Sequence, residues 1–175
     1  MPPDPDIRIV DYDQKWPMLF DTEKARLEAA LGDVAVQIEH MGSTSVPGLA
    51  AKPIIDIDIY VREIEPMEPY REPLERLGYL FQFDPEFPDL HFFAYPEEKP
   101  RQFHVHVAEV ESQYKTRDLA VRDFLRAHPD VAADYAELKR SLTAAHPGDR
   151  DAYINGKAAF MDELITRALR WKGVL

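Results

Sequence analysis

The chain has 175 residues, of which 45% are hydrophobic, and it carries a formal net charge of −11 without any cysteine. This length and apolar content suit one domain with a buried core, and the lack of cysteine excludes disulfides and cysteine-ligated zinc. The negative charge argues against sequence-independent binding of nucleic acid, which needs clustered cations. No apolar stretch reaches membrane-spanning length, and the acidic, proline-rich residues 1–4 are unlike a secretory signal. We therefore expect a cytoplasmic protein with no membrane partner.

Helical and strand patterns alternate through the first two thirds of the chain. An apolar stripe predicts a first helix that stops at Gly32, and prolines separate the short strand candidates that follow. The expected elements, in chain order, are a helix over 14–31, strands over 34–39 and 54–61, a helix over 66–77, and strands over 79–83, 90–95 and 102–109. This order predicts a mixed sheet flanked by helices.

The last third of the chain has helical periodicity over 117–127, 130–145 and 150–171. The last helix needs a partner surface for an apolar face made of Ile154, Ala158, Met161, Ile165, Ala168 and Leu169. We therefore predict one α+β domain over residues 1–175, with a sheet part over about 1–112 and a helical part over about 113–175.

The segment HMGSTSVPGLAAKPIIDIDIY, residues 40–60, places two aspartates in an isoleucine-rich strand. Asp56 and Asp58 are two residues apart, so they project from the same side of the strand. Two like charges repel unless a cation lies between them, and hard divalent cations take carboxylate oxygens. The preceding Gly42-Ser43 turn can offer backbone N–H groups and a hydroxyl to a phosphate. The pattern predicts a metal-dependent phosphate site with Asp56 and Asp58 as catalytic metal ligands; alternatively, the aspartates only line a solvated strand face.

The stretch IEHMGSTSVPGLAAKPIIDIDIYV resembles the signature of the GrpB family. Further similarity lies in FHVHV, RDFLRAHPDVAADYAELK and YINGKAAFMDELITRAL, so the resemblance spans nearly the whole chain. That family is similar to the DNA polymerase beta-like nucleotidyltransferases, whose pattern is a Gly-Ser turn followed by Asp-x-Asp on the next strand. Gly42, Ser43, Asp56 and Asp58 match this pattern. The resemblance implies a nucleotidyltransferase-like sheet and a nucleotide site, without defining a reaction.

A third carboxylate, usual in that superfamily on a later strand, is missing here. The corresponding strand, 102–109, carries His104 and His106 on one face, and the resemblance implies that this strand lies beside the strand of Asp56 and Asp58. Either a histidine replaces the carboxylate as a metal ligand, or the metal site is incomplete and the histidines make ordinary hydrogen bonds. Histidine favours Mn²⁺ or Zn²⁺ over Mg²⁺, so we expect a divalent cation, Mg²⁺ or Mn²⁺, with Zn²⁺ as an alternative.

Three basic residues are candidates for binding phosphate. Lys52 lies in the loop before the aspartates, and Arg122 and Lys157 lie on the following helices, where the resemblance implies contacts to a triphosphate. Each has a simpler interpretation: Lys52 as a solvated loop residue, Arg122 as the partner of Asp123 on a helix surface, and Lys157 as a side chain that extends to solvent.

Two functions of different classes are consistent with these patterns. The first is metal-dependent transfer of a nucleotidyl group from a nucleotide to an unidentified small-molecule or protein acceptor. The second is a non-catalytic interaction or folding-assistance module, which is suggested by the occurrence of this family in fusions to dephospho-CoA kinase.

Overall fold

Five strands form one mixed sheet in the order β1-β2-β5-β4-β3 in a computed structural model that describes residues 4–175. β2 and β5 run parallel, and the other neighbouring strands run antiparallel. The first three residues of the chain lie outside the described part. The strands are β1 (Gln37–Met41), β2 (Ile55–Val61), β3 (Leu80–Gln82), β4 (His91–Tyr95) and β5 (Phe103–Glu109).

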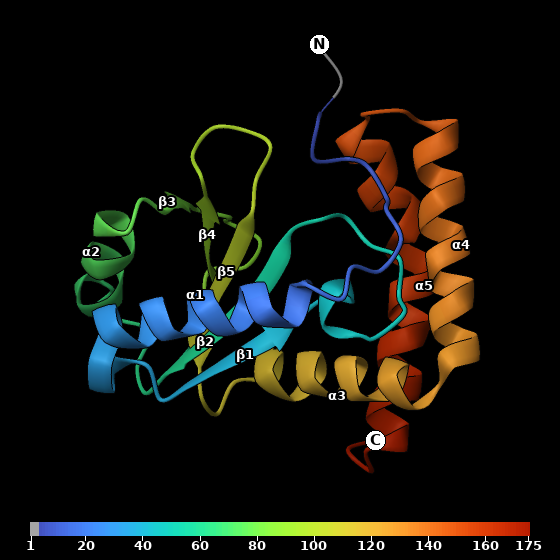
Figure 1. Ribbon diagram of the computed structural model, residues 1–175. Coiled ribbons are helices and arrows are strands. Elements are labelled where there is room, and N and C mark those ends of the chain that lie inside the picture. The colour runs from blue at the N-terminus through green and yellow to red at the C-terminus, as the bar shows by residue number, and fades with distance from the viewer. Residues whose placement is uncertain (1–3) are drawn as a thin grey trace.

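Helices α1 (Trp16–Leu31) and α2 (Glu68–Arg76) cover one face of this sheet (Figure 1). Gly32 ends α1 with a φ of 51°, a conformation that favours glycine. The side chains that face these helices from the central strands are completely buried: Ile57, Ile59, Val105 and Val107. Burial of each such side chain contributes about 1.5–3 kcal/mol, so this face of the sheet is the main core and the opposite face is available for polar residues.

Helices α3 (Gln113–Ala127), α4 (Pro129–Ala145) and α5 (Arg150–Trp171) form the C-terminal part, with α4 and α5 side by side (Figure 1). They share a second core with the loop between β1 and β2, through Val46, Leu49 and Ala50. α3 begins four residues before the expected position because the Ser112 side chain caps it, accepting a hydrogen bond from the Lys115 backbone N–H. The helices are therefore packed against the loop that carries Gly42 and Ser43.

The α+β class predicted from the sequence is confirmed, and every expected helix and strand is present within a few residues of its predicted bounds. The predicted apolar face of the last helix is observed in its C-terminal half, where Ala168 is buried and Met161 and Leu169 pack against the second core, but not in its N-terminal half. Ile154 is 43% exposed, whereas Tyr153 and Leu164 are buried. Near its N-terminus the helix buries Tyr153 and not Ile154, so Ile154 faces a cavity instead of the core. Among the described residues, no helix has the length and apolar content needed to cross a membrane.

Candidate functional site

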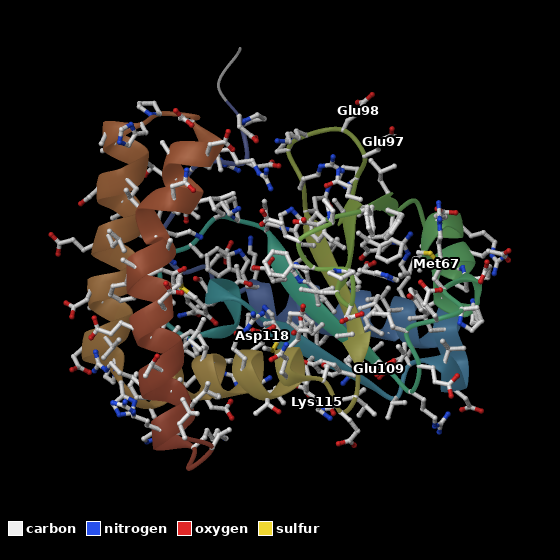
Figure 2. All side chains as sticks on the ribbon, turned by 180° about the vertical axis from the view of Figure 1, so that it is seen from behind. Met67, Glu97, Glu98, Glu109, Lys115 and Asp118 are labelled. Carbon is white, nitrogen blue, oxygen red and sulfur yellow. The ribbon has the colours of Figure 1, made fainter. Side chains whose placement is uncertain are left out.

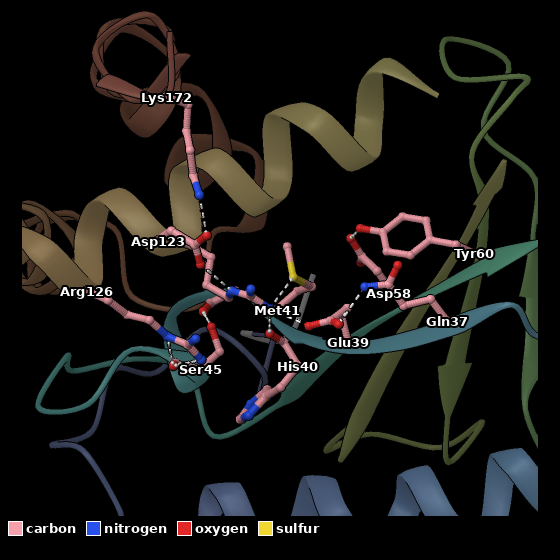
Figure 3. A network of polar contacts seen from close by, with 12 residues as sticks. Gln37, Glu39, His40, Met41, Ser45, Asp58, Tyr60, Asp123, Arg126 and Lys172 are labelled. Atoms are coloured by element: carbon pink, nitrogen blue, oxygen red, sulfur yellow. Dashed lines mark hydrogen bonds and ion pairs between the residues drawn. The ribbon is translucent and has the colours of Figure 1, made fainter. Parts of the chain in front are cut away.

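Each aspartate of β2 lies beside a histidine of β5. The parallel register pairs Asp56 with His104 and Asp58 with His106. Asp56 Oδ1 is 3.4 Å from His104 Nδ1, and Asp58 Oδ1 is 3.5 Å from His106 Nδ1. The other oxygen of Asp58 accepts a hydrogen bond of 3.0 Å from the Tyr60 hydroxyl (Figure 3). The two carboxylates that would repel each other are thus each matched by an imidazole from the neighbouring strand.

The pairing shifts the pKa values of Asp56 and His106. Burial tends to raise the pKa of Asp56, but the hydrogen bond and charge of His104 outweigh it, so the pKa falls below its ordinary value. Burial tends to lower the pKa of His106, but the hydrogen bond to Asp58 raises it overall. The pairing therefore favours an ionised Asp56 and a protonated His106, which is an arrangement of partly compensated charge.

The Gly42-Ser43 turn is pressed against Asp56. Gly42 has a φ of 65°, and a Cβ atom added to it would lie 2.2 Å from Asp56 Oδ2. The next residues form a short 3₁₀ turn, η2 (Ser43–Ser45), which is closed by a 2.7 Å hydrogen bond from Ser45 Oγ to the Gly42 carbonyl. His40 lies buried beside it, with Nε2 3.0 Å from Thr44 Oγ1. Only glycine fits position 42, because both the backbone angle and the carboxylate exclude a side chain.

A buried lysine contacts the same turn. Lys139 of α4 is only 2% exposed, and its Nζ donates hydrogen bonds to Ser43 Oγ at 2.8 Å and to the Ala50 carbonyl at 2.6 Å. No carboxylate within residues 4–175 forms an ion pair with it. Burial, followed by the positive charge of Lys157, lowers the pKa of Lys139 to about 7. A buried lysine without a counter-ion is costly, and an anion at Ser43 would compensate it.

Two further lysines approach Asp56 from the loop and from α5. The ring centroid of Tyr153 lies 5.8 Å from Lys52 Nζ and 4.5 Å from Lys157 Nζ. Burial and the charge of Lys52 lower the pKa of Lys157 to about 8. We call Lys52, Lys139 and Lys157 the lysine cluster. None of the three forms an ion pair with a residue in the described part of the chain. Their unmatched charge contrasts with the net charge of −11.

Arg122, expected to bind phosphate, is occupied by other partners. Its Nη1 donates to Glu39 Oε2 at 2.6 Å and its Nε donates to Asp123 Oδ1 at 3.0 Å. Lys172 also binds Asp123, so the last helix, α3 and β1 are joined in one polar network (Figure 3). This geometry favours an anchoring role for Arg122, and its contact with phosphate remains a prediction.

Sequence reasoning did not identify Arg117 and Asp118, which line the same cavity as the aspartates. Asp118 lies on α3 where this helix passes the sheet (Figure 2). It accepts from Arg117 Nε at 2.6 Å, and burial together with the nearby charge of Asp58 raises its pKa. A third acidic group is thus present, but it comes from a helix and not from the strand on which the superfamily pattern places it. The signal in the sequence was the repeated Arg-Asp pair at 117–118 and 122–123.

Two cavities meet at this face of the sheet. The first has a volume of about 410 Å³, and its polar lining includes Gly42, Ser43, Asp56, Asp58, His106 and Arg117. The second has a volume of about 740 Å³ and contains Lys52, Lys157 and His104. His106 and Arg117 line both cavities. The predicted site residues are therefore brought to one region of the sheet face. The carboxylates of Asp56 and Asp58 line the first cavity, whereas Lys52 and Lys157 line the second.

The chain is similar to several known proteins. Residues 6–167 match the model of the family described as GrpB protein. The UPF0157 protein YqkA of Bacillus subtilis (strain 168) is 40% identical over 95% of this chain, which spans only 48% of the length of YqkA. A dephospho-CoA kinase of Mycolicibacterium paratuberculosis is 31% identical over 94% of this chain and 46% of its own length. The crystal structure of conserved protein GrpB from Enterococcus faecalis has a TM-score of 0.87 at 34% identity and covers 94% of this chain and 99% of that one.

Replacing Gly42 by Ala should disturb the site more than replacing Gly48, a second glycine of the same loop. Both have positive φ, which costs roughly 1–2 kcal/mol for alanine, but a Cβ at Gly48 would meet no atom within 4 Å. The clash with Asp56 should add about 1–3 kcal/mol in Gly42→Ala. Urea unfolding of both variants measures the difference, and equal losses of stability would show that Gly42 does not press against Asp56.

Lys139 and Lys157 should make the protein more stable at alkaline pH. The unfolded chain holds a proton on each lysine up to about pH 10, whereas folded Lys139 releases it near pH 7. The unfolded state therefore binds more protons between these values, and stability should rise with pH by about 1 kcal/mol per pH unit for such a group. Urea unfolding between pH 7.5 and 9.5 should show a smaller rise in Lys139→Met than in the parent, and an unchanged rise in Lys24→Met, a variant of a more exposed lysine. Identical pH dependence in the parent and Lys139→Met would contradict this account.

Proposed function

The chain belongs to the GrpB family, and we propose that it binds a nucleoside triphosphate with a divalent cation at the Asp56–Asp58 face. The nucleotidyl group would pass to a small-molecule or protein acceptor. One observation carries the proposal: the lysine cluster, which forms no ion pair within residues 4–175, adjoins two carboxylates on the same sheet face. A polyphosphate with its cation supplies both of the missing charges, anionic for the lysines and cationic for the aspartates.

The phosphates would bind between the Gly42-Ser43 turn and the lysine cluster. Lys139 already donates to Ser43 Oγ, so the Ser43 hydroxyl, which also contacts Tyr135, can turn its own proton towards a phosphate oxygen. Ser43 is only partly buried and lines the first cavity, whereas Lys139 is enclosed. A phosphate at Ser43 would give the buried ammonium an anionic neighbour in a region of low dielectric, where the attraction is strong.

The residues present fit a cation that arrives with its nucleotide. Within residues 4–175 no group of three or more histidine, cysteine, aspartate or glutamate side chains is arranged to hold a metal ion. Mg²⁺ is usually held by one or two carboxylates together with substrate phosphates and water, and Asp56 and Asp58 can provide this pair. A closed Zn²⁺ site needs four protein ligands, so Mg²⁺ or Mn²⁺ fits better. Such a cation would neutralise charge on the transferred group.

His104 and His106 have a supporting role in this proposal. Each imidazole Nδ1 already faces its own aspartate, at 3.4 and 3.5 Å. This contact orients the carboxylate and partly compensates its charge, as hydrogen-bonded partners of metal ligands commonly do. Direct coordination of the cation by either histidine remains a prediction from the sequence.

A non-catalytic module is the second candidate. The chain corresponds to 46% of the length of a protein named dephospho-CoA kinase, which favours a domain that works attached to a partner. Such a module needs neither the paired carboxylates nor the lysine cluster. Nucleotide binding that depends on these residues therefore separates the two candidates.

A thermal-shift titration with ATP, GTP, CTP and UTP, each with Mg²⁺ or Mn²⁺, tests the proposal. Selective binding to the folded state should raise the melting temperature. Lys157→Gln should weaken binding at least tenfold, because a hydrogen bond to a charged group contributes roughly 1.5–3 kcal/mol, and Lys24→Gln on the outer surface of α1 should match the parent. If no nucleotide stabilises the parent, or if Lys157→Gln responds like Lys24→Gln, the non-catalytic module is the better account.

A further inference from the structure

The second cavity combines two kinds of side chain that are seldom exposed together. Its lining contains six cationic side chains against three acidic ones, although the chain as a whole has 11 more acidic than basic residues. Three of its apolar side chains are also well exposed: Phe83 at 64%, Phe87 at 41% and Ile154 at 43%. Exposed apolar groups gathered in one concave site indicate a binding site more often than a chance surface.

The apolar wall comes from two separate parts of the chain. Phe83 and Phe87 lie in the segment between β3 and β4, and Ile154 lies in the first turns of α5. The ring of Phe92, from β4, continues this wall towards the site, because its centroid lies 5.0 Å from that of His104 and 5.2 Å from that of His106. Phenyl faces of this kind pack well against a planar or apolar group.

The cations of this cavity are only partly compensated. Lys99 is paired with Asp4 and Asp6, and Arg117 is paired with Asp118. Lys52 and Lys157 are assigned to the nucleotide phosphates, but Arg101 and Arg150 also line this cavity, and neither forms an ion pair in the described part of the chain. The cavity is therefore suited to an anion that also carries an apolar group, and less suited to a neutral or cationic molecule.

The position of the second cavity indicates what its ligand does in the proposed transfer. His106 and Arg117 line both cavities, so a molecule in the second cavity ends beside the Asp58–His106 pair, while the Gly42-Ser43 turn lines only the first cavity. A transfer between two small molecules requires both to be held next to each other at the reacting centre.

We propose that the second cavity binds the acceptor, and that the acceptor is a small organic anion with a planar apolar group. This inference rests on the proposed function and names its acceptor class. The volume of about 740 Å³ lies in the range of small-molecule sites, which is roughly 300–1,000 Å³, so the cavity selects a small molecule over a polymer. In the transfer, an acceptor oxygen forms the new bond to the α-phosphorus, the bond to pyrophosphate breaks, and pyrophosphate leaves with the electron pair. The acceptor proton passes to water.

Binding of 1-naphthyl phosphate, followed by its fluorescence anisotropy, tests this assignment. The double variant Phe83→Ala/Phe87→Ala should bind this probe about tenfold more weakly than the parent, because stacking on each ring is lost. Arg150→Gln, a charge variant at the cavity wall, should also weaken binding, whereas Met18→Ala, which removes an exposed apolar side chain on α1, should not. Inorganic phosphate should compete only weakly, and a saturating concentration of ATP with Mn²⁺ should leave the probe bound.

Two results would overturn the assignment. Equal affinity in the parent and the double phenylalanine variant would place the probe elsewhere, and displacement of the probe by ATP with Mn²⁺ would mean that the nucleotide itself fills this cavity. A different result would contradict the proposed nucleotide binding alone. If the parent binds 1-naphthyl phosphate through Phe83 and Phe87 but is not stabilised by any nucleotide, the cavity assignment stands as an anion site and nucleotidyl transfer is excluded.

Discussion

The parallel pairing of β2 with β5 is the constraint on which the rest of the site depends. Its register places Asp56 beside His104 and Asp58 beside His106, and it places Ile57 beside Val105 in the core on the other face. Because side chains alternate along a strand, a slip of one residue would turn the apolar set outward and the carboxylates inward. The large apolar core under α1 and α2 therefore fixes the polar face as firmly as it fixes the fold.

The helical part completes the site by bringing positive charge to this face. Val46, Leu49 and Ala50 pack in the second core among α3, α4 and α5, and Lys139 binds both the Ala50 carbonyl and Ser43 in the same loop. One loop thus connects the helices, the Gly42-Ser43 turn and Asp56. A buried ammonium without a counter-ion opposes folding, and proteins commonly accept such a loss of stability where function requires it. Under the proposed function, the bound anion is the reason why a lysine occupies position 139.

Much of this arrangement could be predicted from the sequence. The two-residue period of a strand is sufficient to place Asp56 and Asp58 on one face, and likewise His104 and His106. The resemblance to nucleotidyltransferases added the expectation that the two strands are neighbours. These predictions succeeded because they depend on local geometry and on strand order.

Other features depend on contacts between distant parts of the chain and could not be predicted in this way. Asp118 reaches the site only because α3 packs beside β1 and β5, and Lys139 is buried against Ser43 only because α4 shares the second core with the loop between β1 and β2. The repeated Arg-Asp pair is the one trace of this arrangement in the sequence. Arg122 has the right chemistry for phosphate, but its partner Glu39 lies 83 residues away. The exposed side of α5 at Ile154 has a similar origin, since it faces a cavity whose opposite wall, at Phe83 and Phe87, belongs to another segment.

The central claim is that two carboxylates hold a cation whose remaining ligands come from a nucleotide. Electron paramagnetic resonance of free Mn²⁺ measures this directly in titrations of the parent and of Asp56→Asn, with and without a non-hydrolysable ATP analogue. The account predicts weak binding of Mn²⁺ to the parent alone, binding at least tenfold tighter with the analogue, and loss of this gain in Asp56→Asn. Equal Mn²⁺ affinity with and without the analogue, or a full gain in Asp56→Asn, would contradict it.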